Sequence, residues 1–114
     1  MDTTLARLKD WGCDIDGALA RTLGDEELLL YCIQQVAIDP AYQQLGQALD
    51  AGDVKAAFDA AHTLKGILGN TGVTPLYDID VQIVEPLRAG HTDGTQDAYR
   101  DLMDQLAELK RQLG

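Results

Sequence analysis

Residues 57–73, AFDAAHTLKGILGNTGV, show the clearest two-faced helical pattern in the chain. At about 100° per residue, one narrow stripe collects the residues with polar or absent side chains: His62, Lys65, Gly66 and Gly69. The opposite face is apolar throughout and should pack inward, and it comprises Ala57, Ala60, Ala61, Leu64, Ile67 and Leu68. The pattern therefore predicts an amphipathic helix whose imidazole faces outward, beside an ammonium group and glycines.

The residue types on the outward stripe are suited to phosphoryl transfer. A neutral imidazole nitrogen is a nucleophile near neutral pH, and a nearby cation stabilises the charge on a phosphoryl group in transfer. Lys65 is a helix-surface neighbour of His62 at i+3. Gly66 costs roughly 1 kcal/mol relative to Ala inside a helix, and close approach by another molecule is one reason to tolerate it. On spacing alone, an exposed histidine without a function is an equally good interpretation.

A family resemblance favours the functional interpretation. Residues 61–66 (AHTLKG), followed by 69–72 (GNTG), resemble the signature of histidine-containing phosphotransfer (HPt) domains. Upstream, residues 24–28 (GDEEL) and 49–53 (LDAGD) resemble the openings of two of the family's helices. Downstream, residues 87–90 (LRAG) continue the likeness. The His-x-x-Lys-Gly core alone would be a weak pattern, but the trailing glycine and the flanking helix openings make it specific.

The resemblance covers most of the chain, from about Asp14 to Gly90. It implies a helical bundle that accepts a phosphoryl group on one histidine and passes it between aspartates of response-regulator receiver domains. By this resemblance His62 accepts the group, Lys65 holds its oxygens and Gly66 leaves room for the partner. The partner-docking surface is expected on the same stripe, at Phe58, Gly69 and Lys55, with partial burial as the alternative for Phe58.

The resemblance also implies the partners and the cofactors. The expected partners are receiver domains and a hybrid histidine kinase, and Mg²⁺ is expected on the receiver rather than on this chain. The sequence has no glycine-rich phosphate loop before a helix, so neither a nucleotide site nor intrinsic kinase activity is expected. One alternative stays open, a non-transferring interaction module of the same fold that binds receivers or kinases without accepting phosphate.

Composition excludes several other classes. The chain has 114 residues and a formal net charge of −10, which argues against binding to nucleic acids or anionic membranes. No apolar run approaches the roughly 20 residues of a membrane span. We expect one domain over residues 1–114, a cytoplasmic location and a monomer, and the opening Met1 and compact length favour a free-standing protein.

Metal binding and disulfide formation are both disfavoured by the positions of the relevant residues. No Glu stands three residues before either His, as the Glu-x-x-His motif of metal-binding bundles requires, so no metal site is expected. Cys13 and Cys32 are isolated, and we expect two reduced thiols with Cys32 in a helix core. A disulfide or a metal pair is the alternative.

Helical periodicity and capping residues predict an all-α fold, an up-and-down antiparallel four-helix bundle with short extra N-terminal helices. Short helices are expected over residues 1–11 and 17–23, and longer ones begin near residues 25, 41, 53, 74 and 95. The apolar helix after Asp25 should have an inner face and an outer apolar strip beside the histidine, with complete burial as the alternative.

Proline and glycine positions predict the boundaries of the central helices. The central helix should run to about Asn70, with Gly72 as its left-handed C-cap. In the next helix, Thr74 should be the N-cap and Pro75 the first residue. An inward stripe is expected at Leu76, Ile79, Ile83 and Leu87. Pro86 interrupts this pattern, and we expect a kink or an early end near Val84.

Overall fold

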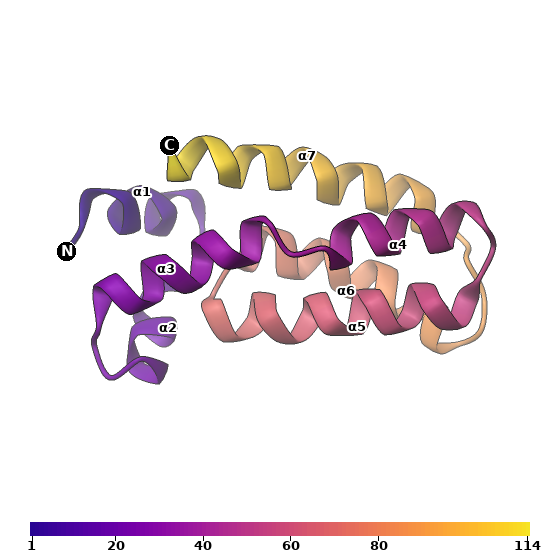
Figure 1. Ribbon diagram of the computed structural model, residues 1–114, viewed down its shortest axis with the longest axis horizontal. Coiled ribbons are helices and arrows are strands. Elements are labelled where there is room, and N and C mark those ends of the chain that lie inside the picture. The colour runs from indigo at the N-terminus through magenta and orange to yellow at the C-terminus, as the bar shows by residue number, and fades with distance from the viewer.

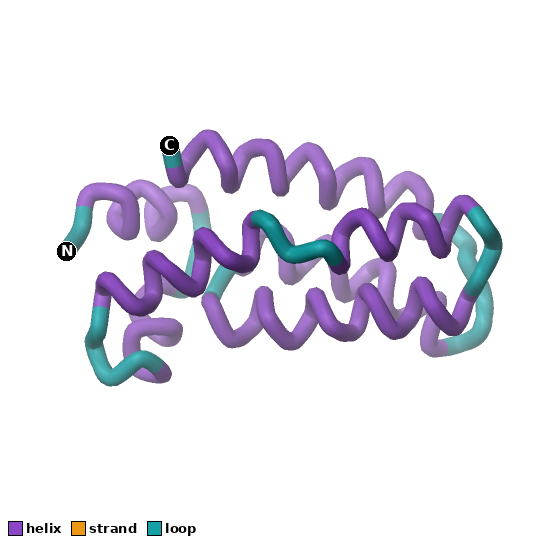
Figure 2. Tube along the Cα trace, viewed as in Figure 1, coloured by secondary structure: helices purple, strands orange, loops and turns teal.

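The computed structural model describes residues 1–114 as seven α-helices joined by short turns (Figures 1 and 2). The helices are α1 (Thr3–Trp11), α2 (Ile15–Arg21), α3 (Glu26–Ala37), α4 (Ala41–Asp50), α5 (Val54–Thr71), α6 (Thr74–Arg88) and α7 (Thr95–Leu113). There are no strands. The predicted all-α bundle with short N-terminal helices is therefore confirmed.

The bundle is elongated, with principal extents of 43 × 24 × 20 Å. Helices α3 and α4 follow one another along the long axis, while α5, α6 and α7 each run along most of its length (Figure 1). The most extensive contacts join α4 to α5, α5 to α6 and α6 to α7, as an up-and-down order requires. The two chain termini lie at the same end of the bundle, next to α1.

Aspartate side chains begin four of the helices, as local capping rules predict. Asp2, Asp14, Asp25 and Asp53 each accept a hydrogen bond from a backbone N–H in the first turn that follows. At the other end of α5, Gly72 adopts the left-handed conformation with φ 72°, so its expected role as C-cap is confirmed.

Three expected boundaries are wrong. Helix α2 covers Ile15–Arg21 rather than residues 17–23, because Asp14 caps it. In α6 the N-cap is Val73, so Thr74 is already helical and Pro75 is its second residue. Pro86 does not end α6 near Val84, since the helix continues to Arg88, and the alternative expectation of a kink stays a prediction. A proline in the last turn removes only one helical hydrogen bond, while buried Leu87 holds that turn against the core.

The core is made almost entirely of aliphatic side chains contributed by all seven helices. Helix α3 buries Leu29 and Ile33 but exposes Leu28 and Tyr31, so it has the expected inner face and an outer apolar strip. The expected place of this strip beside the histidine stays a prediction. Cys13 is the buried cysteine and Cys32 is only half-buried, contrary to the expected core position of Cys32.

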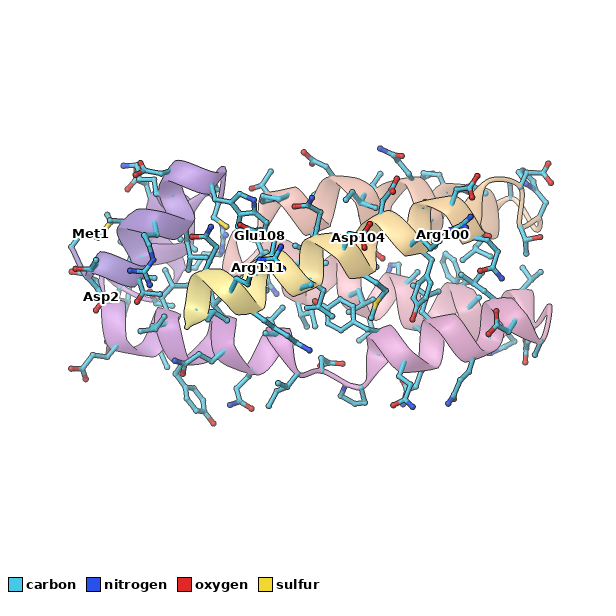
Figure 3. All side chains as sticks on the ribbon, turned by 90° about the horizontal axis from the view of Figure 1, so that it is seen from above. Met1, Asp2, Arg100, Asp104, Glu108 and Arg111 are labelled. Carbon is cyan, nitrogen blue, oxygen red and sulfur yellow. The ribbon has the colours of Figure 1, made fainter.

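The outer side of α7 carries charged residues along its length, among them Arg100, Asp104, Glu108 and Arg111 (Figure 3). Arg111 forms an ion pair with Glu108 one turn earlier, and hydrogen bonds from Gln112 and Arg111 hold the pKa of the Glu108 carboxyl below its ordinary value. None of the helices is both long enough and apolar enough to cross a membrane.

Candidate functional site

Helix α5 holds His62 on its solvent side. Ala57, Ala61, Leu64 and Leu68 on the same helix have no exposed surface, which fixes the rotation of α5 about its axis. His62 lies on the opposite face and is exposed. Because the helix is anchored by a continuous apolar stripe, the histidine stands on a rigid element rather than on a mobile loop.

His62 borders an open pocket of about 310 Å³ between α5 and α6. Four lining residues share its helix, namely Lys65, Gly66, Gly69 and Asn70, and the sixth is Tyr77 of α6. Thus His62, Lys65, Gly66 and Gly69, which the sequence places on one stripe, line one pocket. Tyr77 and Asn70 were not singled out as candidates from the sequence, and only the meeting of α5 with α6 brings Tyr77 to the pocket.

The two glycines of the pocket differ in their surroundings. A Cβ atom added at Gly66 would meet nothing within 4 Å, so the space above it is open to a visiting molecule. A Cβ at Gly69 would lie 3.3 Å from the Cε2 atom of the Tyr77 ring. Packing against Tyr77 within the chain therefore explains why position 69 is a glycine. The part of Gly69 in partner docking stays a prediction.

Phe58 forms the border of the site one turn before His62. It is half-buried, and its ring centroid lies 5.5 Å from that of His62. The guanidinium carbon of Arg88 lies 5.3 Å from the centroid of the same ring, a cation–π contact. Arg88 was overlooked as a candidate in the sequence, although it lies within the LRAG segment that resembles the family.

The two candidate lysines have different environments. Lys65 is half-buried and takes part in none of the ion pairs of the chain. Lys55, in contrast, is exposed and pairs with Asp59, with 3.1 Å between Nζ and Oδ2. Lys55 does not line the pocket. The structure thus brings Lys65 to His62 and leaves Lys55 on the outer surface two turns away.

Asp80 of α6 is the one charged residue in the core. Its side chain has no exposed surface, and neither carboxyl oxygen has a hydrogen-bond partner. Burial raises the pKa of Asp80 to about 7, and the positive charge of Lys65 partly opposes this rise. Asp80 takes the inward place that was expected for Ile79, which is only half-buried. That expectation was wrong because α6 is rotated so that Leu76, Asp80, Ile83 and Leu87 face the core.

Helix α2 secures the end of α5 next to the pocket. The guanidinium group of Arg21 donates hydrogen bonds to the carbonyl oxygens of Asn70 and Gly69, at 2.9 and 3.0 Å. These are terminal carbonyls of α5, which have few partners within the helix. The contact ties the pocket wall to the N-terminal helices.

The second histidine lies apart from the pocket. His91 is exposed in the turn between α6 and α7, where its Nδ1 lies 3.5 Å from Asp93 Oδ2. No group of three or more His, Cys, Asp or Glu side chains lies close enough together to hold a metal ion.

Comparison with known proteins identifies the family of the chain. The sequence profile of the Hpt domain matches residues 27–112, a segment that contains every residue of the pocket. No curated protein and no solved structure matches the chain significantly. Hpt domains carry phosphoryl groups in two-component signalling. Because the match takes in most of the bundle, this protein belongs to the Hpt domain family.

Proposed function

We propose that the protein is a phosphocarrier of a phosphorelay, in which His62 receives a phosphoryl group from one receiver-domain aspartate and gives it to another. The observation that carries the proposal is the arrangement around His62. An exposed imidazole on a rigid helix borders an open pocket with an unpaired lysine, Lys65. The exposed Gly66 leaves the approach to the pocket open.

The transfer is a single displacement at phosphorus. A neutral imidazole nitrogen of His62 attacks the phosphorus of an aspartyl phosphate, so that an N–P bond forms and the bond to the carboxylate oxygen breaks. The carboxylate leaves with the electron pair, and the reverse step passes the group to a second receiver. Lys65 stabilises the charge on the phosphoryl oxygens, and the receiver supplies Mg²⁺.

Docking would involve the half-buried aromatic residue next to the histidine and the surface around it. Phe58 and Arg88 would meet the receiver on one side of His62, and the exposed apolar residues Leu28 and Tyr31 of α3 would add contact area. In this proposal the chain has no kinase activity of its own, depends on a hybrid histidine kinase for its phosphoryl groups, and works as a monomer in the cytoplasm.

The intact mass after incubation with phosphoramidate, which phosphorylates histidine directly, tests the proposal. We expect one added phosphoryl group that brief acid treatment removes. His62→Gln should abolish the gain, and the matched control His91→Gln should retain it. If the folded wild-type protein gains no mass, phosphotransfer is refuted, and receiver binding without transfer becomes the function to measure.

A further inference from the structure

The pocket beside His62 is longer than a single phosphoryl group needs. It follows α5 from His62 to Asn70, a rise of about 12 Å at about 1.5 Å per residue. Lys65, the cation proposed to hold the phosphoryl oxygens, lies less than one turn from the histidine. The pocket therefore has a near end at His62 and Lys65. Its far end, formed by Gly69, Asn70 and Tyr77, is left unoccupied by a phosphoryl group on the histidine.

The two ends of the pocket differ in their chemistry. Lys65 is the one cationic side chain that lines the pocket, and no carboxylate lines any part of it, although the chain has 19 acidic residues. The far end offers only neutral polar groups, the Asn70 carboxamide and the Tyr77 hydroxyl, which both donate and accept hydrogen bonds. A peptide group is also uncharged and carries one donor and one acceptor. Peptide backbone therefore matches the far end, where a second anion would find no cation.

The polar groups of the far end are unused within the chain and are held in place. None of the side-chain hydrogen bonds of the protein involves the Tyr77 hydroxyl or the Asn70 carboxamide. Arg21 donates to the backbone carbonyl of Asn70 at 2.9 Å, which holds the backbone and leaves the carboxamide free. The Tyr77 ring packs over Gly69, where an added Cβ would lie 3.3 Å from it. Groups that are held in position before a ligand arrives lose less conformational entropy on binding.

We propose that Asn70 and Tyr77 form a peptide-binding subsite, which hydrogen-bonds the backbone of the receiver domain close to its phosphorylated aspartate. This inference rests on the proposed function of His62 and extends it to recognition of the partner. Transfer between the histidine and the aspartate brings the receiver chain on either side of that aspartate against α5. An extended chain covers about 3.3 Å per residue, so backbone about three or four residues from the aspartate reaches the far end of the pocket.

The subsite predicts that the protein distinguishes a receiver from a small phosphoryl donor. Phosphoramidate has no peptide backbone and meets only the near end of the pocket. Loss of the far-end hydrogen bonds should therefore slow exchange with a receiver and leave phosphorylation by phosphoramidate unchanged. The subsite lies away from the reacting atoms and binds the receiver equally well before and during transfer. Its loss should therefore raise KM for the receiver and leave kcat almost unchanged.

Transfer kinetics test the inference with the wild type, Tyr77→Phe and Asn70→Ala. Each protein is loaded on His62 with phosphoramidate and mixed with purified receiver domains of the same organism, and the receiver that the wild type phosphorylates fastest is the probe. Each substitution should raise KM for this receiver about threefold to tenfold, the effect of one lost hydrogen bond. Both variants should fold, because Tyr77→Phe keeps the ring over Gly69 and Asn70→Ala keeps the carbonyl that Arg21 binds.

Gln82→Ala is the matched control, because Gln82 carries an exposed carboxamide on α6 and lines none of the pockets; it should leave KM at the wild-type value. If Tyr77→Phe and Asn70→Ala also keep the wild-type KM, or slow phosphorylation by phosphoramidate equally, the inference is overturned while the proposed function stands. If the wild type is not loaded, or exchanges with no receiver, the proposed function itself fails and the subsite with it.

A measurement on the wild-type chain needs no substitution. In an NMR titration, the side-chain amide resonances of Asn70 should shift when the same receiver is added and should stay in place when inorganic phosphate alone is added. A shift with phosphate alone would identify the far end as an anion site and contradict the inference. Resonances that ignore the bound receiver would contradict it as well.

Discussion

The buried carboxyl of Asp80 makes the stability of the bundle depend on pH in a way that one substitution should remove. Burial raises its pKa from 3.8 in the unfolded chain to about 7 in the folded protein. The folded state therefore holds a proton that the unfolded state releases across this range. Stability linked to Asp80 is fully present below about pH 4, declines as the pH rises, and is lost once the pH passes about 7.

The size of the effect follows from the displacement of the pKa. Each unit corresponds to about 1.4 kcal/mol, so the full shift from 3.8 to about 7 lowers the free energy of unfolding by roughly 4 kcal/mol once the carboxyl is ionised in both states. Between about pH 5 and about pH 8 the loss is roughly 2–3 kcal/mol. This is a large fraction of the stability of an ordinary small domain.

Asp80→Asn keeps the shape of the side chain but cannot ionise. The difference in the free energy of unfolding between this variant and the wild type should therefore rise by roughly 2–3 kcal/mol from about pH 5 to about pH 8. Any effect of the amide that does not depend on pH cancels from this change. Urea unfolding followed by circular dichroism at the two pH values measures this change. The control Asp78→Asn, on the exposed side of α6, should differ from the wild type by the same small amount at both. A stability difference for Asp80→Asn that is the same at both pH values would refute a buried, ionising carboxyl.

Three further predictions concern the pocket and its supports. Gly66→Ala should fold normally, because nothing lies within 4 Å of the new Cβ. It should slow transfer from a phosphorylated receiver at least about tenfold more than it slows phosphorylation by phosphoramidate. Equal effects on both donors would argue against close approach of the receiver at Gly66. Gly72→Ala should destabilise the bundle by more than about 1 kcal/mol in urea unfolding, since φ is +72° and the Cβ would lie 2.4 Å from the carbonyl oxygen of Asp14; an unchanged midpoint would contradict this geometry. Arg88→Ala should weaken receiver binding severalfold by calorimetry while changing the unfolding free energy by less than about 1 kcal/mol, and unaltered binding would remove Arg88 from the docking surface.

The parts of the site that lie on one helix could be predicted from the sequence. His62, Lys65, Gly66 and Gly69 occur within eight residues, so helical spacing alone puts them on one stripe. The caps at Asp25 and Asp53 are just as local, because each side chain reaches a backbone N–H three residues away. Such interactions depend on neighbours in the chain and need no knowledge of the rest of the fold.

The contributions of α6 could not be predicted in the same way. The inward stripe of Leu76, Ile83 and Leu87 is compatible with either position 79 or position 80 facing the core, and Ile79 was expected there because it is the apolar one of the two. The choice between them is made by simultaneous packing of α6 against α5 and α7, where burying Leu76, Ile83, Val84 and Leu87 together outweighs the burial of one carboxyl. The same packing of Leu87 carries α6 past Pro86.

By itself, then, the sequence determined the helices, most of their caps and the stripe that carries His62, because these follow from spacings of three and four residues within one helix. Only the tertiary structure decided that Tyr77 covers Gly69 and that Arg88 contacts Phe58. Each of these contacts joins α5 to α6, and the register between two helices is set by the packing of their whole apolar faces, which no local pattern encodes.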